Sequence, residues 1–573
     1  MALRAILLTP LILVFLAIVL TLARRTYSLI QNYIEARKLG ISIVIVPVEW
    51  HDQVWILIRK PFKWIGSIPL LGYWYKFSYL GSVLDYRHKL HEKLGDVFAI
   101  VSPKAIVLEV NDPHAGLVLQ RDYKTWLKPK DLYEIFDIYG PGLVSVNGED
   151  WQRHRRIVNP AFREQNYKLV WNESLKQTDQ MLDLRMNTTK GIASMADWRT
   201  DLHLLAIHVL SAAGFGHSHD FSRGLQEVPE GKTKSFSGAL NFLLMNILPV
   251  LIFGKMKLPE FLTWAKYREI HGAIKDFGEY MAESVAYTRA TTQSGGGGRQ
   301  ADIASALIEA DEAAKREDKL NSKTFGKSKP NYLSDEELYG NLYAFNIAGF
   351  DTTAGSLSYA MPLLALNEDV QKWVVEELDA IFGTNSPVQS DYETNFPKLT
   401  RCLAVMHETI RLWGPLPEIA RVPAGEGQSL RVGDKELFIT KDMQVSTNFY
   451  GIHADPRWWG PASLEWQPER WVTKDNDTGL ESINCPADGA TFLGWSAGPR
   501  ICPGKKFSQV EFVATIATLL HKFRLKPLVM QELGMKNEGD AREALRKTVA
   551  ASQFMLTTKM IAPENAGVVL VPR

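Results

Sequence analysis

The chain has 573 residues, and its 65 Lys and Arg nearly balance its 64 Asp and Glu. This balance argues against a protein that binds nucleic acid, or an acidic partner, over its whole surface. Its cysteines, Cys402, Cys485 and Cys502, are too few for a disulfide framework and are typical of a chain that faces a reducing compartment. Length alone suggests about three or four domains, but no interior linker separates two independently patterned halves.

The N-terminus begins with an almost continuous apolar stretch from Ala5 to Ala23, followed by Arg24 and Arg25. A membrane-spanning helix needs roughly 20 such residues. A cleaved secretory signal is the alternative, but no small-residue cleavage site follows and the basic pair favours a retained single-pass anchor with the rest of the chain in the cytosol. A second apolar stretch, Ile41 to Ile58, contains polar residues and is interpreted as an interfacial segment.

Further along the chain, the alternation from Gly95 to Val110 predicts two short strands around Ser102-Pro103, and Pro and Gly punctuate a loop from Lys124 to Gly142. Gly148 to Arg156 begins a helix on which Trp151 and Arg155 share one face.

The apolar stretch from Ser235 to Leu262 is interrupted by proline and glycine, and is either core or an apolar lip near the membrane. Gly295 to Gly298 and a polar run from Glu309 to Asn331 predict a flexible surface connection. The stretch from Phe554 to Arg573 predicts terminal β-segments.

A long helix is predicted to begin at the capping box Ser334-Asp-Glu-Glu337. Its middle carries Ala348-Gly-Phe-Asp-Thr-Thr353. Gly, Asp and Thr are poor residues for a helix interior, and a Thr hydroxyl can bond back to a preceding carbonyl and bend the helix. We therefore expect a local irregularity and a functional site at this point.

The segment Trp495-Ser-Ala-Gly-Pro-Arg-Ile-Cys-Pro-Gly504 precedes an apolar helical pattern. Gly498 and Gly504 suit a backbone that takes a positive φ or closely approaches a flat ligand. Cys502 lies just before the helix N-terminus, where free N–H groups and the helix dipole favour a thiolate able to bind iron, and Arg500 adds a cation. A lone cysteine is more often a buried structural residue, so the surrounding motifs must decide.

This segment resembles the haem-ligand loop of the cytochrome P450 family, whose Gly-x-Arg-x-Cys-x-Gly pattern matches Gly498, Arg500, Cys502 and Gly504. The family usually has Phe where this chain has Trp495. Four further motifs follow the family's order and lie at Trp151 to Arg155, Ala348 to Thr353, Glu408 to Arg411, and Pro468 to Trp471. The resemblance implies a mainly α fold with small β-sheets (α+β), the cytochrome P450 fold. An N-terminal transmembrane helix would precede it, with an anchor over residues 1–25, an interfacial segment and hinge over 26–70, and the catalytic domain over 71–573.

The resemblance also implies roles for individual residues. The iron of haem b (iron protoporphyrin IX) would be bound by Cys502. The residues expected around this cofactor are Trp151, Arg155, Gly349, Arg421, Trp495, Gly498, Arg500 and Gly504. Of these, Trp151, Arg155 and Arg421 match propionate-binding positions. A buried ionic triad would join Glu408, Arg411 and Arg470.

Proton delivery to bound dioxygen would fall to Asp351 and Thr352, and Thr352→Ala is expected to release more peroxide and less product. By motif position, the substrate pocket would be lined by Ala344, Ala348, Phe350, Leu416, Glu418 and Phe554. The indole N–H of Trp495 has two interpretations: it bonds the Cys502 sulfur and raises the haem potential, or it bonds a backbone carbonyl or water.

The implied function is a haem-dependent monooxygenase of the endoplasmic reticulum membrane that inserts one atom of O2 into a lipophilic small molecule by hydroxylation, epoxidation or multistep oxidation. The chain resembles fungal secondary-metabolism members, whose substrates are compounds such as terpenoids, polyketides or alkaloids. No Gly-rich flavin or dinucleotide fingerprint occurs, so electrons are expected from NADPH through a separate NADPH-cytochrome P450 reductase, with cytochrome b5 as an optional second donor. No nucleic-acid partner is expected.

Two rival functions remain. A haem-thiolate isomerase or dehydratase would need no reductase, but such members of the family tend to lose the Asp351-Thr352 pair. A non-catalytic haem sensor or lipophile carrier would need Cys502 and have no use for that pair. Product formation that requires NADPH and reductase distinguishes both from a monooxygenase.

Overall fold

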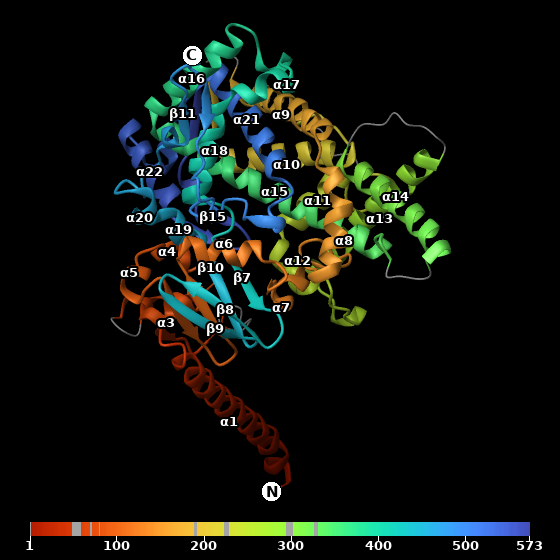
Figure 1. Cartoon of the computed structure of the whole chain (residues 1–573), viewed down its shortest axis with the longest axis vertical. Coiled ribbons are helices and arrows are strands. Elements are labelled where there is room, and N and C mark those ends of the chain that lie inside the picture. The colour runs from red at the N-terminus through yellow and green to blue at the C-terminus, as the bar shows by residue number, and fades with distance from the viewer. Residues whose placement is uncertain are drawn as a thin grey trace.

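The structure, a computed structural model, describes residues 2–48, 55, 59–68, 72–79, 81–187, 192–222, 228–293, 302–325 and 330–573. Helices gather in the upper part of Figure 1 and a strand-rich part lies below them. From this lower part the long helix α1 (Ala2–Arg37) projects away from the body, with the N-terminus at its far end. The expected mainly α fold with small sheets is confirmed.

The helices account for most of the described chain. After α1 their bounds are α3 (Gly72–Phe77), α4 (Val83–Tyr86), α5 (His91–Leu94), α6 (Pro113–Arg121), α7 (Lys130–Tyr133), α8 (Gly148–Val158), α9 (Glu164–Arg185), α10 (Trp198–Phe215), α11 (Phe236–Met245), α12 (Ile247–Phe253), α13 (Ala265–Gln293), α14 (Ile303–Phe325), α15 (Asp335–Leu366), α16 (Glu368–Phe382), α17 (Tyr392–Asn395), α18 (Thr400–Trp413), α19 (Phe449–Ala454), α20 (Pro456–Trp459), α21 (Lys505–Lys522) and α22 (Glu538–Ala550).

The largest sheet has the strand order β1-β2-β3-β10-β7-β4. Its strands are β1 (Ser42–Ile45), β2 (Val97–Val101), β3 (Ile106–Val110), β10 (Met443–Asn448), β7 (Glu418–Pro423) and β4 (Trp126–Leu127). The antiparallel pair β2–β3 is the one that the sequence predicted around Ser102-Pro103. One face of the sheet packs on α1 through Ala36, so the end of this helix is anchored on the folded body.

The remaining strands form small sheets. They are the four-stranded sheet β13 (Phe523–Pro527), β16 (Val568–Pro572), β6 (Ile192–Met195) and β5 (Met186–Asn187), and the pairs β8 (Gly427–Val432) with β9 (Lys435–Thr440), β11 (Val472–Lys474) with β12 (Glu481–Ile483), and β14 (Ser552–Phe554) with β15 (Thr558–Met560). The terminal β-segments predicted after Phe554 are therefore present, although the last strand, β16, joins β13 and β6 rather than the hairpin.

Helix α15 runs through the centre of the helical body and packs against α10 and α18. It begins at the predicted capping box: the Ser334 hydroxyl accepts from the Glu337 N–H, and the Glu337 carboxylate accepts from the Ser334 N–H. A helix that is apolar on most sides is typical of a protein core. The expected irregularity at residues 348–353 does not interrupt the helix, and the Thr352 hydroxyl donates to the carbonyl of Ala348 at 2.7 Å.

Two predicted connections are corrected. The polar run from Glu309 is helical up to Phe325, because Ile303, Leu307 and Ile308 give α14 a buried apolar side; residues 294–301, with the glycines, lie outside the described residues. In the predicted loop from Lys124 to Gly142, β4 and α7 are short regular elements.

The structure describes only part of the N-terminal segments that were predicted to be a membrane anchor and an interfacial segment. The side chains of residues 1–12 and 14 lie outside the described part, as do residues 49–54 and 56–58 of the predicted interfacial segment. Strand β1, at the start of that segment, pairs with β2 and so belongs to the large sheet. Within the described part of the chain, none of the helices combines the length and the apolar character needed to cross a membrane.

Candidate functional site

Cys502 lies in a tight loop between Trp495 and the start of α21. Its N–H donates to the Trp495 carbonyl at 3.0 Å. Gly498 has a φ of 67°, and a Cβ at this position would lie 2.7 Å from Cα of Arg121 on α6, so only glycine allows the loop to pack against that helix. Gly504 has an ordinary φ of −82°; a Cβ there would lie 3.9 Å from Cys502 Sγ, so its glycine keeps the sulfur uncovered.

The electrostatics of Cys502 differ from the sequence-based expectation of a favoured thiolate. Burial among protein atoms raises the pKa of the thiol, and the Gly504 N–H and the cations of Arg155 and Lys505 oppose this rise without cancelling it. Cys502 nevertheless keeps solvent-exposed surface, so a ligand can reach this residue. A metal ion bound there would deprotonate the thiol outright.

Three cations gather beside this loop: Arg421 and Arg500 are buried, and Lys128 is half-buried. Arg421 donates to Gln120 Oε1 at 2.5 Å, Arg500 donates to Asn147 Oδ1 at 2.9 Å, and Lys128 donates to the Val144 carbonyl at 2.6 Å. The Arg500 guanidinium also lies 4.6 Å from the ring centre of Trp151, on α8. Nε of Arg421 and Nε of Arg500 have no partner in the described part of the chain.

These cations lack a negative partner. Burial, together with repulsion from Arg421, lowers the pKa of Arg500 to about 9. Burial, with repulsion from Arg500 and Arg421, holds the pKa of Lys128 well below its usual range. Among the described residues, no carboxylate contributes to the pKa of any of the three. Buried cations normally have anionic partners, so the cluster fits a ligand with more than one negative charge, such as the two propionates of haem b.

The predicted triad is brought together at the end of α18. Arg411 donates from Nε and Nη2 to the two oxygens of Glu408 at 2.7 and 2.8 Å, and Arg470 donates from Nε to Glu408 Oε1 at 3.2 Å. Arg411 Nη1 donates to the carbonyls of His453 and Ser463, both at 2.6 Å. The triad therefore ties α18 to the segment that leads to the Cys502 loop.

Asp351 and Thr352 point in different directions from α15. Thr352 is half-buried, next to the exposed Ala348. Asp351 is buried, and its carboxylate contacts His203 of α10 at 3.2 Å, Lys559 of β15 at 2.9 Å and the Thr557 hydroxyl at 2.5 Å. Burial would raise the pKa of Asp351, but the hydrogen bond from His203, with Lys559 and Thr557, overcomes this and holds it well below the usual range.

Comparison with known proteins decides the family. The sequence profile described as Cytochrome P450 matches residues 64–549. The chain belongs to the cytochrome P450 family. A cytochrome P450 monooxygenase of Arthrobotrys oligospora is 29% identical over 574 residues, covering 96% of both chains. The phomenoic acid biosynthesis cluster cytochrome P450 monooxygenase of Leptosphaeria maculans is 24% identical, covering 90% of this chain and 92% of that one.

A crystal structure of a cytochrome P450 superposes with a TM-score of 0.61 at 19% identity, covering 86% of this chain and 98% of that chain, and it shows the shared fold. The protein is a cytochrome P450 monooxygenase, and its family implies a haem-thiolate cofactor, a redox partner and a small-molecule substrate.

The predicted pocket residues of this P450 divide into two groups. Leu416 is 44% exposed, Ala348 is exposed, and Glu418 and Phe554 are half-buried, whereas Ala344 is buried. Phe350 is corrected: only 1% of it is exposed, and its ring packs edge-on against His203, on the side of α15 away from Ala348.

The indole of Trp495 is the second correction. Its N–H donates to the Ser508 hydroxyl at 3.1 Å, and that hydroxyl donates to the Lys505 carbonyl at 2.8 Å. Trp495 therefore does not use its N–H on the Cys502 sulfur, and the partner is a side-chain hydroxyl rather than the carbonyl or water of the other interpretation.

Several residues that contact the site could not be identified from the sequence. Lys128 lies in the predicted loop, His203 on an apolar helix, and Lys559 in the terminal β-segments, and none carries a recognisable motif. Trp471 also joins the triad, because its indole N–H donates to Glu408 Oε2 at 2.8 Å.

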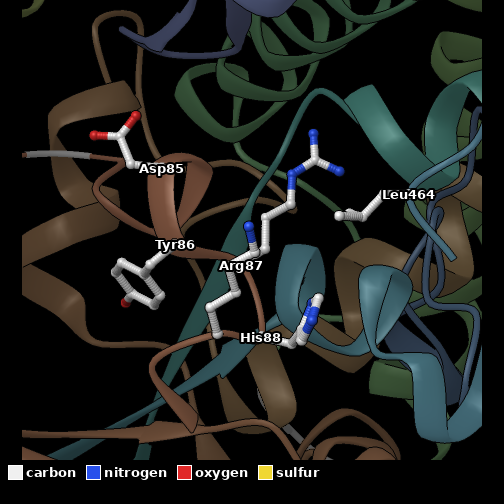
Figure 2. A pocket seen from close by; sticks show the side chains of 6 residues that line it. Asp85, Tyr86, Arg87, His88 and Leu464 are labelled. Carbon is white, nitrogen blue, oxygen red and sulfur yellow. The ribbon is translucent and has the colours of Figure 1, made fainter. Parts of the chain in front are cut away.

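A separate surface pocket of about 250 Å³ is lined by Asp85, Tyr86, Arg87, His88, Lys89 and Leu464 (Figure 2). None of the predicted site residues contributes to it.

Proposed function

We propose that this P450 binds haem b and uses it to insert one oxygen atom of O2 into a lipophilic secondary metabolite, with electrons from NADPH through a separate reductase. The observation that carries the proposal is the cluster of two buried and one half-buried cations beside the Cys502 loop, which has no acidic partner among the described residues. Relatives support the metabolic setting: besides the phomenoic acid cluster enzyme, a ganoderic acid synthetase of Ganoderma lucidum is 26% identical, covering 88% of this chain and 95% of that chain.

The residues present would hold the cofactor from two sides. Cys502 would supply the thiolate ligand to the iron, and Lys128, Arg421 and Arg500 would neutralise the propionates. When bound, haem b supplies the chemistry of dioxygen activation and oxygen transfer. The short side chain of Ala348 leaves room on the exposed side of α15. Gly349 instead allows close packing with α10, because a Cβ at this position would lie 3.3 Å from Cδ1 of Leu210.

Proton delivery would be the task of Thr352 and Asp351. The Thr352 hydroxyl is held by the Ala348 carbonyl, which leaves its oxygen free to accept a proton-bearing partner. Asp351 is held as a carboxylate by His203, Lys559 and Thr557. The Lys559 side chain is 21% exposed, so it gives this buried acid a connection towards solvent.

The proposal includes the endoplasmic reticulum membrane, with a single-pass anchor and a cytosolic catalytic domain. Along α1, Leu13, Phe15 and Leu20 are each more than 60% exposed. A second exposed apolar group lies in and after α12, where Phe261 is 84% exposed and Trp264 43% exposed. Apolar side chains in such numbers are costly in water and are typical of a surface that meets lipid.

The spectrum of the reduced enzyme with carbon monoxide tests the haem-thiolate assignment. We expect the thiolate-type spectrum in the wild type, in Cys402→Ala and in Cys485→Ala, and its loss in Cys502→Ala. A thiolate-type spectrum in Cys502→Ala would overturn the assignment. Monooxygenase activity is then tested by product formation from a metabolite extract, which must require both NADPH and reductase; product without them would favour an isomerase or dehydratase.

A further inference from the structure

Three polar side chains share one face of the large sheet. Ser446 on β10 lies opposite Glu109 on β3, and Asn448, two residues further along β10, lies opposite Glu418 on β7. Because side chains two residues apart project from the same face of a strand, Glu109, Ser446 and Glu418 lie side by side across three neighbouring strands. Arg421 is three residues beyond Glu418 and so projects from the other face.

The surroundings of the two glutamates indicate which of them carries the negative charge. The Ser446 hydroxyl donates to Glu418 Oε2 at 2.5 Å. Burial, and the neighbouring Glu418, raise the pKa of Glu109 well above its usual range. Burial also raises the pKa of Glu418, but donation from Ser446 and from Glu109 opposes this. The shared proton therefore belongs to Glu109, and the negative charge to Glu418.

This charge has no counter-ion. The titratable groups on this face are Tyr86 of α4, Tyr79 beyond it, and His91 of α5, whose ring packs on Phe98 opposite Glu109 and contacts Asn448. Burial lowers the pKa of His91 to about 4, so this side chain carries no positive charge at neutral pH. Among the described residues, no Lys, Arg or His contributes to the pKa of Glu109 or Glu418. A buried carboxylate without a cation is unusual, because the cost of its desolvation is not repaid.

Two further polar atoms at this place lack a partner. The Tyr86 hydroxyl and Glu109 Oε2 make no hydrogen bond within the described part of the chain, although Tyr86 is only 7% and Glu109 only 4% exposed. Burial, followed by the charges of the two glutamates, raises the pKa of Tyr86, so its hydroxyl lies close to both. In Figure 2 its ring points away from Leu464, on the other side of the surface pocket that both residues line. Nearby Ser82 opposes the rise without making a hydrogen bond of good geometry.

Glu418 is itself one of the residues predicted to line the substrate pocket. Glu418 is half-buried and lies two residues after the exposed Leu416. Phe554, at the tip of the β14–β15 hairpin, packs against Gly81 just before α4, so closely that a Cβ on Gly81 would overlap its side chain. The same small region thus joins a pocket residue, an uncompensated carboxylate and two unpaired polar atoms.

We propose that Glu418, oriented by Ser446 and Glu109, binds a cationic group of the substrate, and that the substrate class is a lipophilic amine that is protonated at neutral pH. The inference rests on the proposed function, because it takes the space beside Leu416 as the substrate pocket. A cation would pair with the negative charge of Glu418, beside the Ser446 hydroxyl that already donates to this carboxylate.

Three probes of equal chain length test the proposal on the full-length holoenzyme: decyltrimethylammonium, 1-decanol and decanoate, each measured by equilibrium dialysis. We expect the cation to bind about tenfold more tightly than the alcohol, and decanoate to bind more weakly than either. The preference for the cation should weaken as the pH falls and Glu418 takes up a proton. Equal binding of cation and alcohol would overturn the proposal and favour a neutral substrate.

Isosteric variants test whether Glu418 causes the preference for the cation. Glu418→Gln should abolish the preference for the cation, whereas Glu109→Gln should keep it, because the amide still donates to Glu418. Glu426→Gln, at a side chain that is 86% exposed, is the matched surface control. Survival of the preference in Glu418→Gln would also overturn the proposal. The thiolate-type carbon monoxide spectrum of each variant tests the haem-thiolate function independently and checks that the variant is folded.

Discussion

At the scale of single residues, the charge of Lys128 is expected to have opposite effects in the two forms of the protein. It should lower the free energy of unfolding of the haem-free protein and strengthen the binding of haem. Lys128→Met removes a half-buried cation that has no acidic partner, so the free energy of unfolding of the haem-free protein should rise by about 1–3 kcal/mol. Haem should be retained less well, because a propionate loses a partner. Urea unfolding and transfer of haem to apomyoglobin measure the two effects, with Lys130→Met, at a side chain that is 76% exposed, as the control.

The pH dependence of Lys128 has a definite sign. Its pKa is lowered in the folded apoprotein, so between this value and the ordinary lysine value the unfolded chain binds more protons than the folded one. The free energy of unfolding must therefore rise with pH across that window. Lys128→Met should flatten this rise, and a rise of unchanged slope would show that other groups cause it.

For Trp495 we predict that substitution leaves the haem reduction potential unchanged. Its N–H is already bound to the Ser508 hydroxyl, so it withdraws no electron density from the Cys502 sulfur. Trp495→Phe should leave the haem reduction potential unchanged in spectroelectrochemical titration and cost only the hydrogen bond, about 1 kcal/mol of stability. A clear fall in potential would mean that the indole turns to the sulfur once haem is bound.

At the scale of elements, Asp351 joins α15, α10 and the β14–β15 hairpin. Asp351→Asn leaves the cation of Lys559 without its partner and should lower the free energy of unfolding at neutral pH by roughly 3–5 kcal/mol. Because the pKa of Asp351 is depressed on folding, its contribution is complete above the ordinary Asp pKa and is lost as the pH falls below about 4. Unfolding measured across this range should therefore show a smaller acid loss in the variant.

The same variant tests proton delivery. General acid–base groups typically contribute about 10²-fold or more, so product formation by Asp351→Asn should fall by that order while haem binding is retained. Asp369→Asn, at a side chain that is 97% exposed on α16, is the control. Wild-type coupling of NADPH oxidation to product in Asp351→Asn would mean that protons reach the site by another route.

At the scale of the whole molecule, α1 is expected to decide the location. Deletion of residues 2–25 removes exposed leucines and phenylalanine of α1 but leaves Ala36, which packs on the sheet. The shortened protein should move from the membrane pellet towards the supernatant after carbonate washing, with an unchanged carbon monoxide spectrum. A full-length protein that carbonate releases completely would contradict the anchor. If the shortened protein stays partly bound, Phe261→Ser should release more of it.

The sequence by itself determined the family and the order of the motifs, and it predicted Cys502 as the iron ligand, because each of these depends on short runs of residues such as Gly498 to Gly504. It also determined α15 and its capping box, since helix periodicity and capping are local. Tertiary structure alone decided the partners of these residues: Lys128 beside Arg421 and Arg500, Lys559 and His203 on Asp351, Ser508 on Trp495, and Glu109 beside Glu418. The physical reason is that a pKa or a hydrogen bond depends on burial and on neighbours that are hundreds of residues away in the chain, and no local pattern encodes them.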